Sequence, residues 1–546
     1  MASCGLVHLR IPMLLLPPLR RFSLRLLAHQ LPLRLLAHSL LWGLAGLACS
    51  PALPQSVAPP ASSTGATGVA AGLPNLGDGS DMTPAAERRI GDRIARELYR
   101  DPDYLDDPVI TDYVQGIWQP LVAAARQRGE LPAQLDEAFA WEILLGRDRT
   151  VNAFALPGGY FGLHLGLVGI VTSRDELASV LAHELSHVTQ RHISRSMARQ
   201  AAQAPWLMGA MVLGMLAASK DPNAAQAAIV GGQAAAAQSQ LNYSRDMERE
   251  ADRIGFAVLT QAGFAPQGFV SMFEKLQQSS RLNDAGGFPY LRSHPLNTER
   301  IADMQSRVNQ SERAASSPVT TLEHAMVAAR ARVLSNSAVD ALRVWEQQAH
   351  SANLGSQAAA AQVGTLYGAS LAALKLREFA LAQATLARLQ VRTAGNAAAA
   401  RLTRLLAQEL ALTQGDIAKA QSLGQGPADN SRAAVLMRTR IATLAGLGEQ
   451  AAQELQTWLA DHPHDAQAWQ QLGAADAATG RAVAAVRAEA EVNVAQLDYA
   501  AALTRFKAAQ ALARSSSLAA DHIDASIVDT RARQMESLLR EQALER

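Results

Sequence analysis

A short run of ionisable side chains, His183-Glu184-Leu185-Ser186-His187, has the residue types and the spacing of a metal site. It lies within Ser173–Arg195, whose pattern is helical. Residues four apart share one face of a helix, so the imidazoles of His183 and His187 can reach one ion. Glu184 projects to the side, where it can act on a water molecule rather than bind the metal. The pattern predicts hydrolysis at a zinc ion.

Apolar residues around this run indicate that the helix is largely buried. They are Leu177, Val180, Leu181, Leu185 and Val188. The alternative is a polar helix face that carries two unconnected histidines. Burial argues against it, because two histidines and a glutamate inside a protein need polar partners.

A zinc site of this kind needs a third protein ligand and leaves a fourth position open. In one known arrangement a third histidine follows the second by six residues, after a glycine. Here Ile193 holds that position and Gln190 replaces the glycine, so this arrangement is excluded. His192, five residues after His187, is expected to be a solvated helix residue.

A second acidic segment offers better candidates about 60 residues further on. Glu248 and Asp252 are four residues apart and share a helix face, so one can bind zinc while the other orients a ligand histidine. Glu250 lies between them and is expected at the surface. The alternative is a charged surface helix without a metal.

The composition and charge of the whole chain indicate what class of protein carries these residues. It has 546 residues, 49% of them apolar and only 5% aromatic, with alanine-rich runs that favour helix, so a mostly helical protein of several domains is expected. Lys and Arg number 50 against 49 Asp and Glu. This balance argues against a protein that binds the phosphate backbone of a nucleic acid.

Together, these segments resemble the M48 family of zinc metalloproteases. The matching stretches are Asn152–Gly159 (NAFALPGG), His183–His187, Glu248–Asp252 (EREAD), Ser293–Pro295 (SHP) and Glu299–Ile301 (ERI). The resemblance covers roughly residues 83–310 and implies a zincin-like α+β domain. It also implies that Asn152–Gly159 forms a strand beside the cleft, where substrate could add as an extended strand.

The resemblance assigns roles to individual residues of this chain. It implies that His183, His187 and Glu248 bind one zinc ion, that Glu184 is the general base, and that Asp252 orients a ligand histidine. In exported bacterial relatives the histidine that matches His294 can occupy the open zinc position and silence the protease. The alternative is that His294 only packs a His-Pro turn.

An apolar segment, Trp206–Ala218, lies between the two metal-binding segments. Thirteen residues are too few to span a bilayer. We expect a buried helix; the alternative is a mobile, methionine-rich cover over the cleft.

The chain after residue 320 has the pattern of a tetratricopeptide repeat array. Ala451, Leu455, Trp458 and Pro463, followed by Trp469, Leu472 and Gly473, match one 34-residue repeat and the start of the next. The repeats are degenerate, since Asp476 stands where the motif has an aromatic residue. Such arrays offer concave surfaces that bind protein segments. The alternative is an ordinary helical domain.

The first fifty residues have the pattern of an export signal. Five arginines precede the mostly apolar run Leu35–Ala48, and no Asp, Glu or Lys occurs among them. The alternatives are an uncleaved membrane anchor and a lipidated Cys49. Residues 51–82 are rich in Pro, Ala, Ser and Gly and are expected to form a flexible linker.

The sequence therefore predicts an export signal (1–50), a linker (51–82), an M48 protease domain (83–315) and a tetratricopeptide-like domain (320–546). This combination resembles the family of beta-barrel assembly-enhancing proteases, which implies a zinc endopeptidase of the periplasm. An uncleaved N-terminus would attach it to the membrane. By that resemblance its substrates are misfolded or stalled outer-membrane proteins, and the repeats contact the outer-membrane assembly machinery. The alternative is a chaperone or scaffold with a largely silent metal site.

Overall fold

The computed structural model describes residues 82–200, 244–282, 288–310, 319–426, 428–515 and 519–544. The predicted export signal, all of the predicted linker except its last residue, and the segment Trp206–Ala218 lie outside the described residues. No helix within the described ranges has the length and the apolar composition that crossing a bilayer requires.

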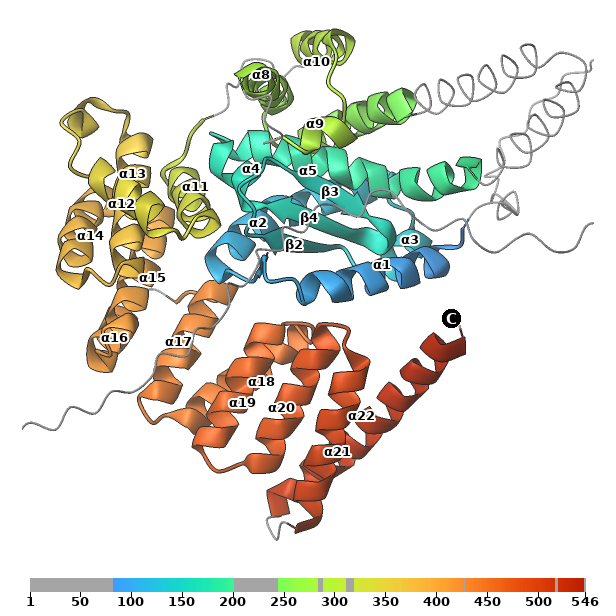
Figure 1. Ribbon diagram of the computed structural model, residues 1–546, viewed down its shortest axis with the longest axis vertical. Coiled ribbons are helices and arrows are strands. Elements are labelled where there is room, and N and C mark those ends of the chain that lie inside the picture. The colour runs from blue at the N-terminus through green and yellow to red at the C-terminus, as the bar shows by residue number, and fades with distance from the viewer. Residues whose placement is uncertain are drawn as a thin grey trace, which may run out of the picture. The chain divides into compact units, whose positions relative to one another are not determined.

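A four-stranded sheet lies among the helices of the first part of the described chain (Figure 1). Its strands are β1 Tyr104–Leu105, β2 Glu142–Gly146, β3 Ala153–Leu156 and β4 Tyr160–His164, in the order β1-β2-β4-β3. β2 and β4 are parallel, and the other two pairs are antiparallel. The strand expected within Asn152–Gly159 is therefore β3, and it forms an edge of the sheet.

Helices pack on both faces of this sheet. The helices of this part are α1 Pro84–Tyr99, α2 Pro108–Gln127, α3 Ala133–Ala138, α4 Leu165–Ile170, α5 Arg174–Thr189, α8 Gln267–Leu282, α9 Tyr290–Ser293 and α10 Thr298–Gln310, with further helices over residues 192–200 and 244–261. α8 packs on α5, and α10 packs on α8. Successive residues of β4 face opposite ways. Tyr160 packs with Ala95 of α1, whereas Phe161 contacts Trp118 of α2, with ring centroids 4.5 Å apart. α5 packs on α2 and beside β3.

Helix α5, which carries the histidine motif, begins at a polar cap and ends earlier than expected. The Ser173 hydroxyl accepts a hydrogen bond from the Glu176 amide at 3.1 Å, which satisfies a donor of the first turn. The prediction of one helix through Arg195 is wrong, because Arg191 is in the left-handed region with φ 54°. A residue in that conformation cannot continue an α-helix. A new helix starts at residue 192.

The second part of the described chain is a helical array, as predicted. Its helices are α11 Leu322–Ser335, α12 Val339–Gln348, α13 Ala359–Lys375, α14 Phe379–Thr393, α15 Ala397–Thr413, α16 Ile417–Leu423, α17 Arg432–Leu444, α18 Gly448–Asp461, α19 Ala466–Ala478, α20 Ala482–Ala495, α21 Tyr499–Ser515 and α22 Ala519–Leu544. From α17 to α22, each helix packs on the next (Figure 1).

The residues that indicated a repeat junction lie at buried positions of α18 and α19. Ala451, Leu455 and Leu472 are fully buried. Gly473 lets α19 approach α20, because a Cβ atom there would lie 3.3 Å from the Ala485 carbonyl oxygen, a tight contact. Asp476, the departure from the motif, is also fully buried and lies 3.2 Å from the Arg481 guanidinium. An ion pair therefore replaces the aromatic contact at this position.

A buried ion pair joins the repeat helices to the protease part. Asp107 caps α2 by accepting a hydrogen bond from the Ile110 amide at 3.0 Å. Its carboxylate also lies 2.8 Å from the Arg330 guanidinium of α11, and both side chains are less than a tenth exposed. Arg330 in turn lies 3.1 Å from Glu409 of α15.

We expect Arg330→Met to destabilise the protein by about 3–5 kcal/mol, because the Asp107 carboxylate would stay buried without its cation. Urea unfolding of the full chain measures the change. The double variant Arg330→Met, Asp107→Leu should recover part of the loss, since it removes both charges. Equal stability of the wild type and Arg330→Met would contradict this account of the ion pair.

Candidate metal centre

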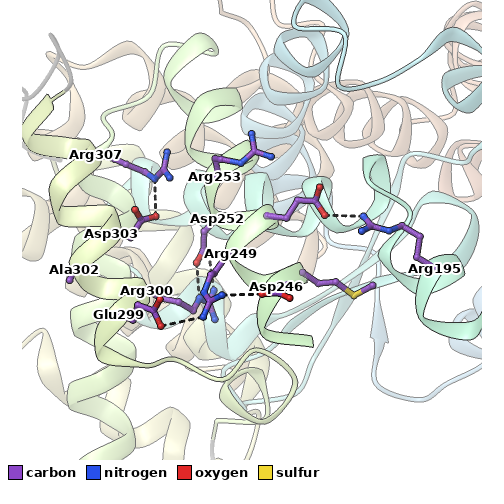
Figure 2. A pocket seen from close by; sticks show the side chains of 12 residues that line it. Arg195, Asp246, Arg249, Asp252, Arg253, Glu299, Arg300, Ala302, Asp303 and Arg307 are labelled. Carbon is purple, nitrogen blue, oxygen red and sulfur yellow. Dashed lines mark hydrogen bonds and ion pairs between the residues drawn. The ribbon is translucent and has the colours of Figure 1, made fainter. Parts of the chain in front are cut away.

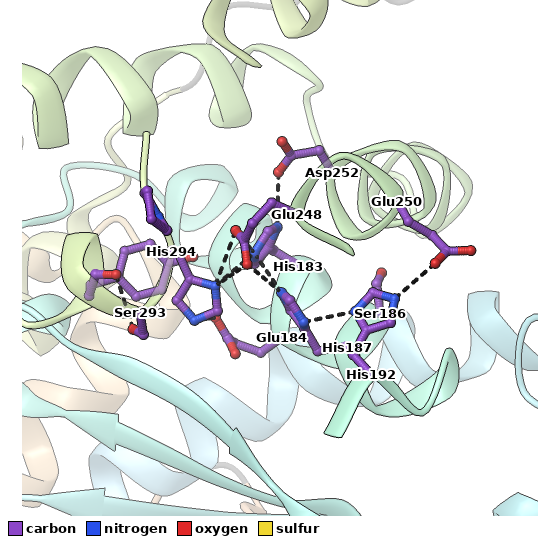
Figure 3. Close-up of polar contacts among 12 residues, drawn as sticks. His183, Glu184, Ser186, His187, His192, Glu248, Glu250, Asp252, Ser293 and His294 are labelled. Carbon is purple, nitrogen blue, oxygen red and sulfur yellow. Dashed lines mark hydrogen bonds and ion pairs between the residues drawn. The ribbon is translucent and has the colours of Figure 1, made fainter. Parts of the chain in front are cut away.

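Four buried side chains from three segments of the chain converge at one point (Figure 3). His183 and His187 come from α5, and Glu248 comes from the helix over residues 244–261. His294 directly follows α9. One potential ligand atom from each residue lies within 4.8 Å of all the others. The structure thus brings the expected ligands together, with His294 among them.

The distances from His183 to the other three residues are close to those in a zinc site. Nε2 of His183 lies 3.0 Å from Nε2 of His187 and 3.3 Å from Nδ1 of His294. It also lies 3.4 Å from an oxygen of Glu248. Tetrahedral zinc with bonds of 2.0–2.1 Å places neighbouring ligand atoms about 3.3 Å apart. The donor set, three imidazoles and a carboxylate, is also one that zinc accepts.

The charges buried around these ligands also favour a cation. Glu184, Glu248 and Asp252 are each at most 4% exposed, and Arg300 is the buried guanidinium that contacts two of them. Without metal, these three carboxylates face one guanidinium and the protonated ring of His183, so one negative charge is left in excess among the buried groups. Such an excess is costly unless a cation balances it. A divalent metal ion would supply that balance.

Glu184 differs from Glu248 and Asp252 because neither of its oxygens has a hydrogen-bond partner among the described residues. The side chain is 1% exposed. Its nearest ionisable contact is Nε2 of His294, 3.4 Å from Oε1. A buried carboxylate without hydrogen bonds is available to accept a proton from a molecule that enters the site.

Asp252 lies behind His183, on the side away from the other ligands. Its Oδ1 is 2.9 Å from Nδ1 of His183. Arg300 holds this carboxylate through two hydrogen bonds, of 2.6 and 2.8 Å. The same guanidinium lies 3.0 Å from Glu248 and donates to the Pro295 carbonyl at 2.9 Å. Arg300 therefore links two carboxylates of the site to the segment that carries His294.

The pKa values of the site follow from these contacts. Burial alone lowers the pKa of His183, but Asp252 and Glu248 outweigh burial and raise the pKa to about 10. Burial raises the pKa of Glu248, but His183 and His294 outweigh it and hold that pKa well below its usual value. Without metal, His183 thus keeps a proton between two carboxylates. Zinc binding must release that proton, so the affinity for zinc falls as the pH falls.

His294 is held in the site by its own segment. Its backbone amide donates to the Tyr290 carbonyl at 2.8 Å, and its ring stacks on the Tyr290 ring with centroids 4.7 Å apart. Nδ1 lies 3.0 Å from Glu248, and Nε2 points toward Glu184. The imidazole consequently fills the space between the ligand group and Glu184.

One expectation about the surroundings of His187 is wrong. His192 was expected to be solvated, but it is 3% exposed, and its Nδ1 lies 2.9 Å from Nδ1 of His187. Glu250 was expected at the surface; its side chain is 29% exposed, and its carboxylate also contacts Nε2 of His192 at 3.0 Å and Arg195 at 2.9 Å. The physical reason is the turn at Arg191, which brings His192 back beside the end of α5.

Close helix packing brings Glu248 to the histidines. A Cβ atom at Gly255 would lie 3.1 Å from the backbone of Ala182 and His183, so glycine lets the helix over residues 244–261 approach α5. The sequence assigned no role to Gly255 or to Arg300. Arg300 stood in a matching stretch, but its contact with Asp252 joins residues 48 positions apart, which no local pattern shows.

A pocket of about 690 Å³ lies next to this centre (Figure 2). Charged side chains dominate its lining, which includes Asp252 and Arg300. None of His183, Glu184, His187 and His294 is among the residues described as lining it. The pocket therefore lies behind the ligands and is not the place where a substrate would meet Glu184.

Comparison with known proteins shows which protein family the chain resembles. The sequence profile of peptidase family M48 matches residues 113–308, a range that contains all four clustered residues. A relative from Vibrio cholerae, named "Putative beta-barrel assembly-enhancing protease", is 36% identical over 463 residues, which cover 83% of this chain and 91% of the relative.

Two further relatives share parts of the chain. The beta-barrel assembly-enhancing protease of Escherichia coli is 32% identical, and the match covers 60% of this chain and 64% of the relative. A mitochondrial metalloendopeptidase of Saccharomyces cerevisiae is 29% identical over 196 residues, or 35% of this chain and 54% of the relative.

Proposed function

The chain belongs to peptidase family M48 and is a zinc metalloendopeptidase; from this premise we propose that it acts in the periplasm, in assembly and quality control of outer-membrane proteins. The names of the relatives from Vibrio cholerae and Escherichia coli support a role in beta-barrel assembly. The predicted export signal at residues 1–50 supports a location outside the cytoplasm.

His183, His187 and Glu248 hold the zinc in this proposal, and their mutual distances support it. Zinc bound there would supply a Lewis acid that polarises the substrate carbonyl and makes water more acidic. Glu184 is the general base: it takes the proton from the attacking water and passes it to the leaving amine. The observation that carries this assignment is the buried Glu184 carboxylate without a hydrogen bond among the described residues.

Asp252 and His294 have supporting roles in the same proposal. Asp252, held by Arg300, keeps the ring of His183 oriented with Nε2 toward the metal. His294 is the regulatory fourth ligand: its ring occupies the space that water would need between the metal and Glu184. The structure then corresponds to a resting enzyme, and the segment around His294 must move before catalysis.

Strand β3 is the proposed docking edge for the substrate. It pairs with β4 on one side only and lies beside α5, so an unfolded segment can add to it in extended form next to Glu184. Misfolded or stalled outer-membrane proteins, which expose unpaired strands, are the proposed substrates. The helical array after residue 320 is the proposed contact surface for the outer-membrane assembly machinery.

The proposed division of the chain follows the expectation from sequence: an export signal (1–50), a linker (51–82), the protease domain (83–315) and the repeat domain (320–546). Thr83 caps α1 at the proposed start of the protease domain, where its hydroxyl accepts from the Ala86 amide at 3.2 Å. Membrane association, if the N-terminus is retained, would arise from the export segment.

The choice of carboxylate ligand can be tested with two variants on one helix. Glu248→Ala should lose far more zinc affinity than Glu250→Ala, because Glu248 lies among the ligand atoms whereas Glu250 contacts His192 and Arg195, which are not ligands. Metal content measured after dialysis compares the two proteins. Equal loss, or loss only in Glu250→Ala, would show that the assignment of Glu248 is wrong.

The proposed function itself is tested with one outer-membrane beta-barrel protein offered in two states. The enzyme should degrade the barrel protein in its unfolded state and spare it once it is folded in detergent micelles, because only the unfolded chain can pair with β3. Cleavage of both states at one rate would contradict the proposed selectivity.

A chaperone or scaffold with a silent metal site is the second candidate, and the position of His294 favours it. The zinc-loaded Glu184→Gln protein separates the two functions. If it suppresses aggregation of the unfolded barrel protein as well as the wild type does, and the wild type degrades none of it, the chaperone role accounts for the function. If the wild type degrades the unfolded barrel protein and the Glu184→Gln variant does not, the result supports the protease.

A further inference from the structure

Nδ1 of His187, the ring nitrogen that faces away from the clustered ligands, has a partner of its own. Nε2 of His187 lies among the ligand atoms, 3.0 Å from His183 and 3.4 Å from Glu248. On the other side of the ring, Nδ1 lies 2.9 Å from Nδ1 of His192. Nε2 of His192 then lies 3.0 Å from Glu250 (Figure 3).

The donors and acceptors in this chain of contacts fix where the hydrogens lie. The Glu250 carboxylate only accepts, so Nε2 of His192 carries the hydrogen and donates it. An imidazole with one N–H then accepts at Nδ1, so Nδ1 of His187 must donate. His187 is thereby left with its lone pair at Nε2, which is the nitrogen that faces the other ligands.

The backbone holds His192 and Glu250 in these positions. The turn at Arg191 is fixed by a contact of 3.1 Å between its guanidinium and Glu87, and it returns His192 to the side of His187. Glu250 is oriented by Arg195 at 2.9 Å. His192 is 3% exposed, so water does not compete for its ring.

Each histidine of the motif is thus held, directly or through His192, by a carboxylate from the helix over residues 244–261. Asp252, held by Arg300, lies behind His183, and Glu250, held by Arg195, lies behind His187 with His192 between them. The partners of a ligand histidine set its tautomer and orientation, and their loss weakens metal binding.

We propose that His192 and Glu250 are positioning residues of the zinc site, which fix the tautomer and the ring orientation of His187 through an imidazole-carboxylate relay. The inference rests on the proposed ligation of zinc by His187. It assigns a purpose to the break in the helix after Thr189, because an unbroken helix would carry His192 away from this contact.

The test compares the zinc affinity of His192→Leu and His192→Gln in the full chain, measured by competition with a chromophoric chelator at constant pH. Leucine removes both hydrogen bonds, and zinc affinity should fall about 10- to 100-fold. Glutamine can accept from Nδ1 of His187 and donate to Glu250, so its zinc affinity should stay within about threefold of wild type.

A second pair of variants tests the carboxylate. Glu250→Ala should weaken zinc binding as His192→Leu does, and the double variant should be no weaker than either single variant, because the two residues act as one unit. The matched control is Glu274→Ala, which removes an exposed carboxylate on α8. This variant should bind zinc like the wild type. The melting temperature of each zinc-free protein reports on folding separately.

Unchanged zinc affinity in folded His192→Leu and Glu250→Ala would overturn the inference. Equal weakening by leucine and glutamine, together with lower melting temperatures of the zinc-free proteins, would also overturn it and leave a packing role only. If Glu248→Ala loses zinc while His192→Leu retains wild-type affinity, the inference fails and the proposed zinc site stands. If the wild type binds no zinc, the proposed site itself fails.

Discussion

Glu184→Gln is expected to lower proteolysis by about 100- to 10,000-fold, the usual contribution of a general base, while the protein keeps its zinc. Glutamine has the shape of glutamate but cannot accept the proton of the attacking water. Zinc should remain, because Glu184 is not one of the four clustered residues that could hold the metal. Casein cleavage and zinc content, measured on one preparation, check both parts.

The exposed carboxylate of Glu274 offers the matched control for this change. Glu274→Gln removes a charge of the same kind from the surface of α8 and should leave both measurements unchanged. Wild-type proteolysis by zinc-loaded Glu184→Gln would exclude Glu184 as the base. Loss of zinc from that variant would instead place Glu184 among the ligands.

His294→Ala is expected to raise proteolysis severalfold, and self-cleavage can accompany the increase. The imidazole lies with Nδ1 3.0 Å from Glu248 and Nε2 3.4 Å from Glu184, so its removal opens the space that water needs. Zinc should stay bound through His183, His187 and Glu248, which form a complete set of three protein ligands.

Zinc content, melting temperature and casein cleavage of His294→Ala distinguish three roles. Higher cleavage with zinc retained supports silencing by His294. A lower melting temperature with unchanged activity per folded molecule indicates a packing role on Tyr290. Reduced cleavage in a folded, zinc-loaded protein indicates help to the transition state and excludes silencing. His350→Ala, which alters an exposed histidine, controls for the loss of an imidazole.

Local patterns predicted the part of the site that lies on one helix. The spacing of His183 and His187 follows from the helical repeat, and the apolar residues around them predicted the burial that α5 shows. Glu248 and Asp252 were identified as a pair by the same spacing, but only the family resemblance chose between them. The structure places Glu248 among the ligand atoms and Asp252 behind His183.

The contacts that sequence missed depend on backbone turns and on distant residues. His192 was misjudged because a positive φ at Arg191, which is not a glycine, leaves no mark in the sequence. Of the sheet, only β3 was expected, because it lies in the stretch Asn152–Gly159 that matched the family, whereas β1, β2 and β4 lie outside that stretch. Asp476 weakened the repeat motif, yet its ion pair with Arg481 fills the same buried position.

The most direct test of the account measures zinc content and proteolysis together, on the wild-type protein, as a chelator removes the metal and zinc is then returned. We expect one zinc per chain, proteolysis that falls in proportion to the zinc removed, and recovery when one equivalent is restored. Proteolysis that persists in protein stripped of zinc would contradict the account.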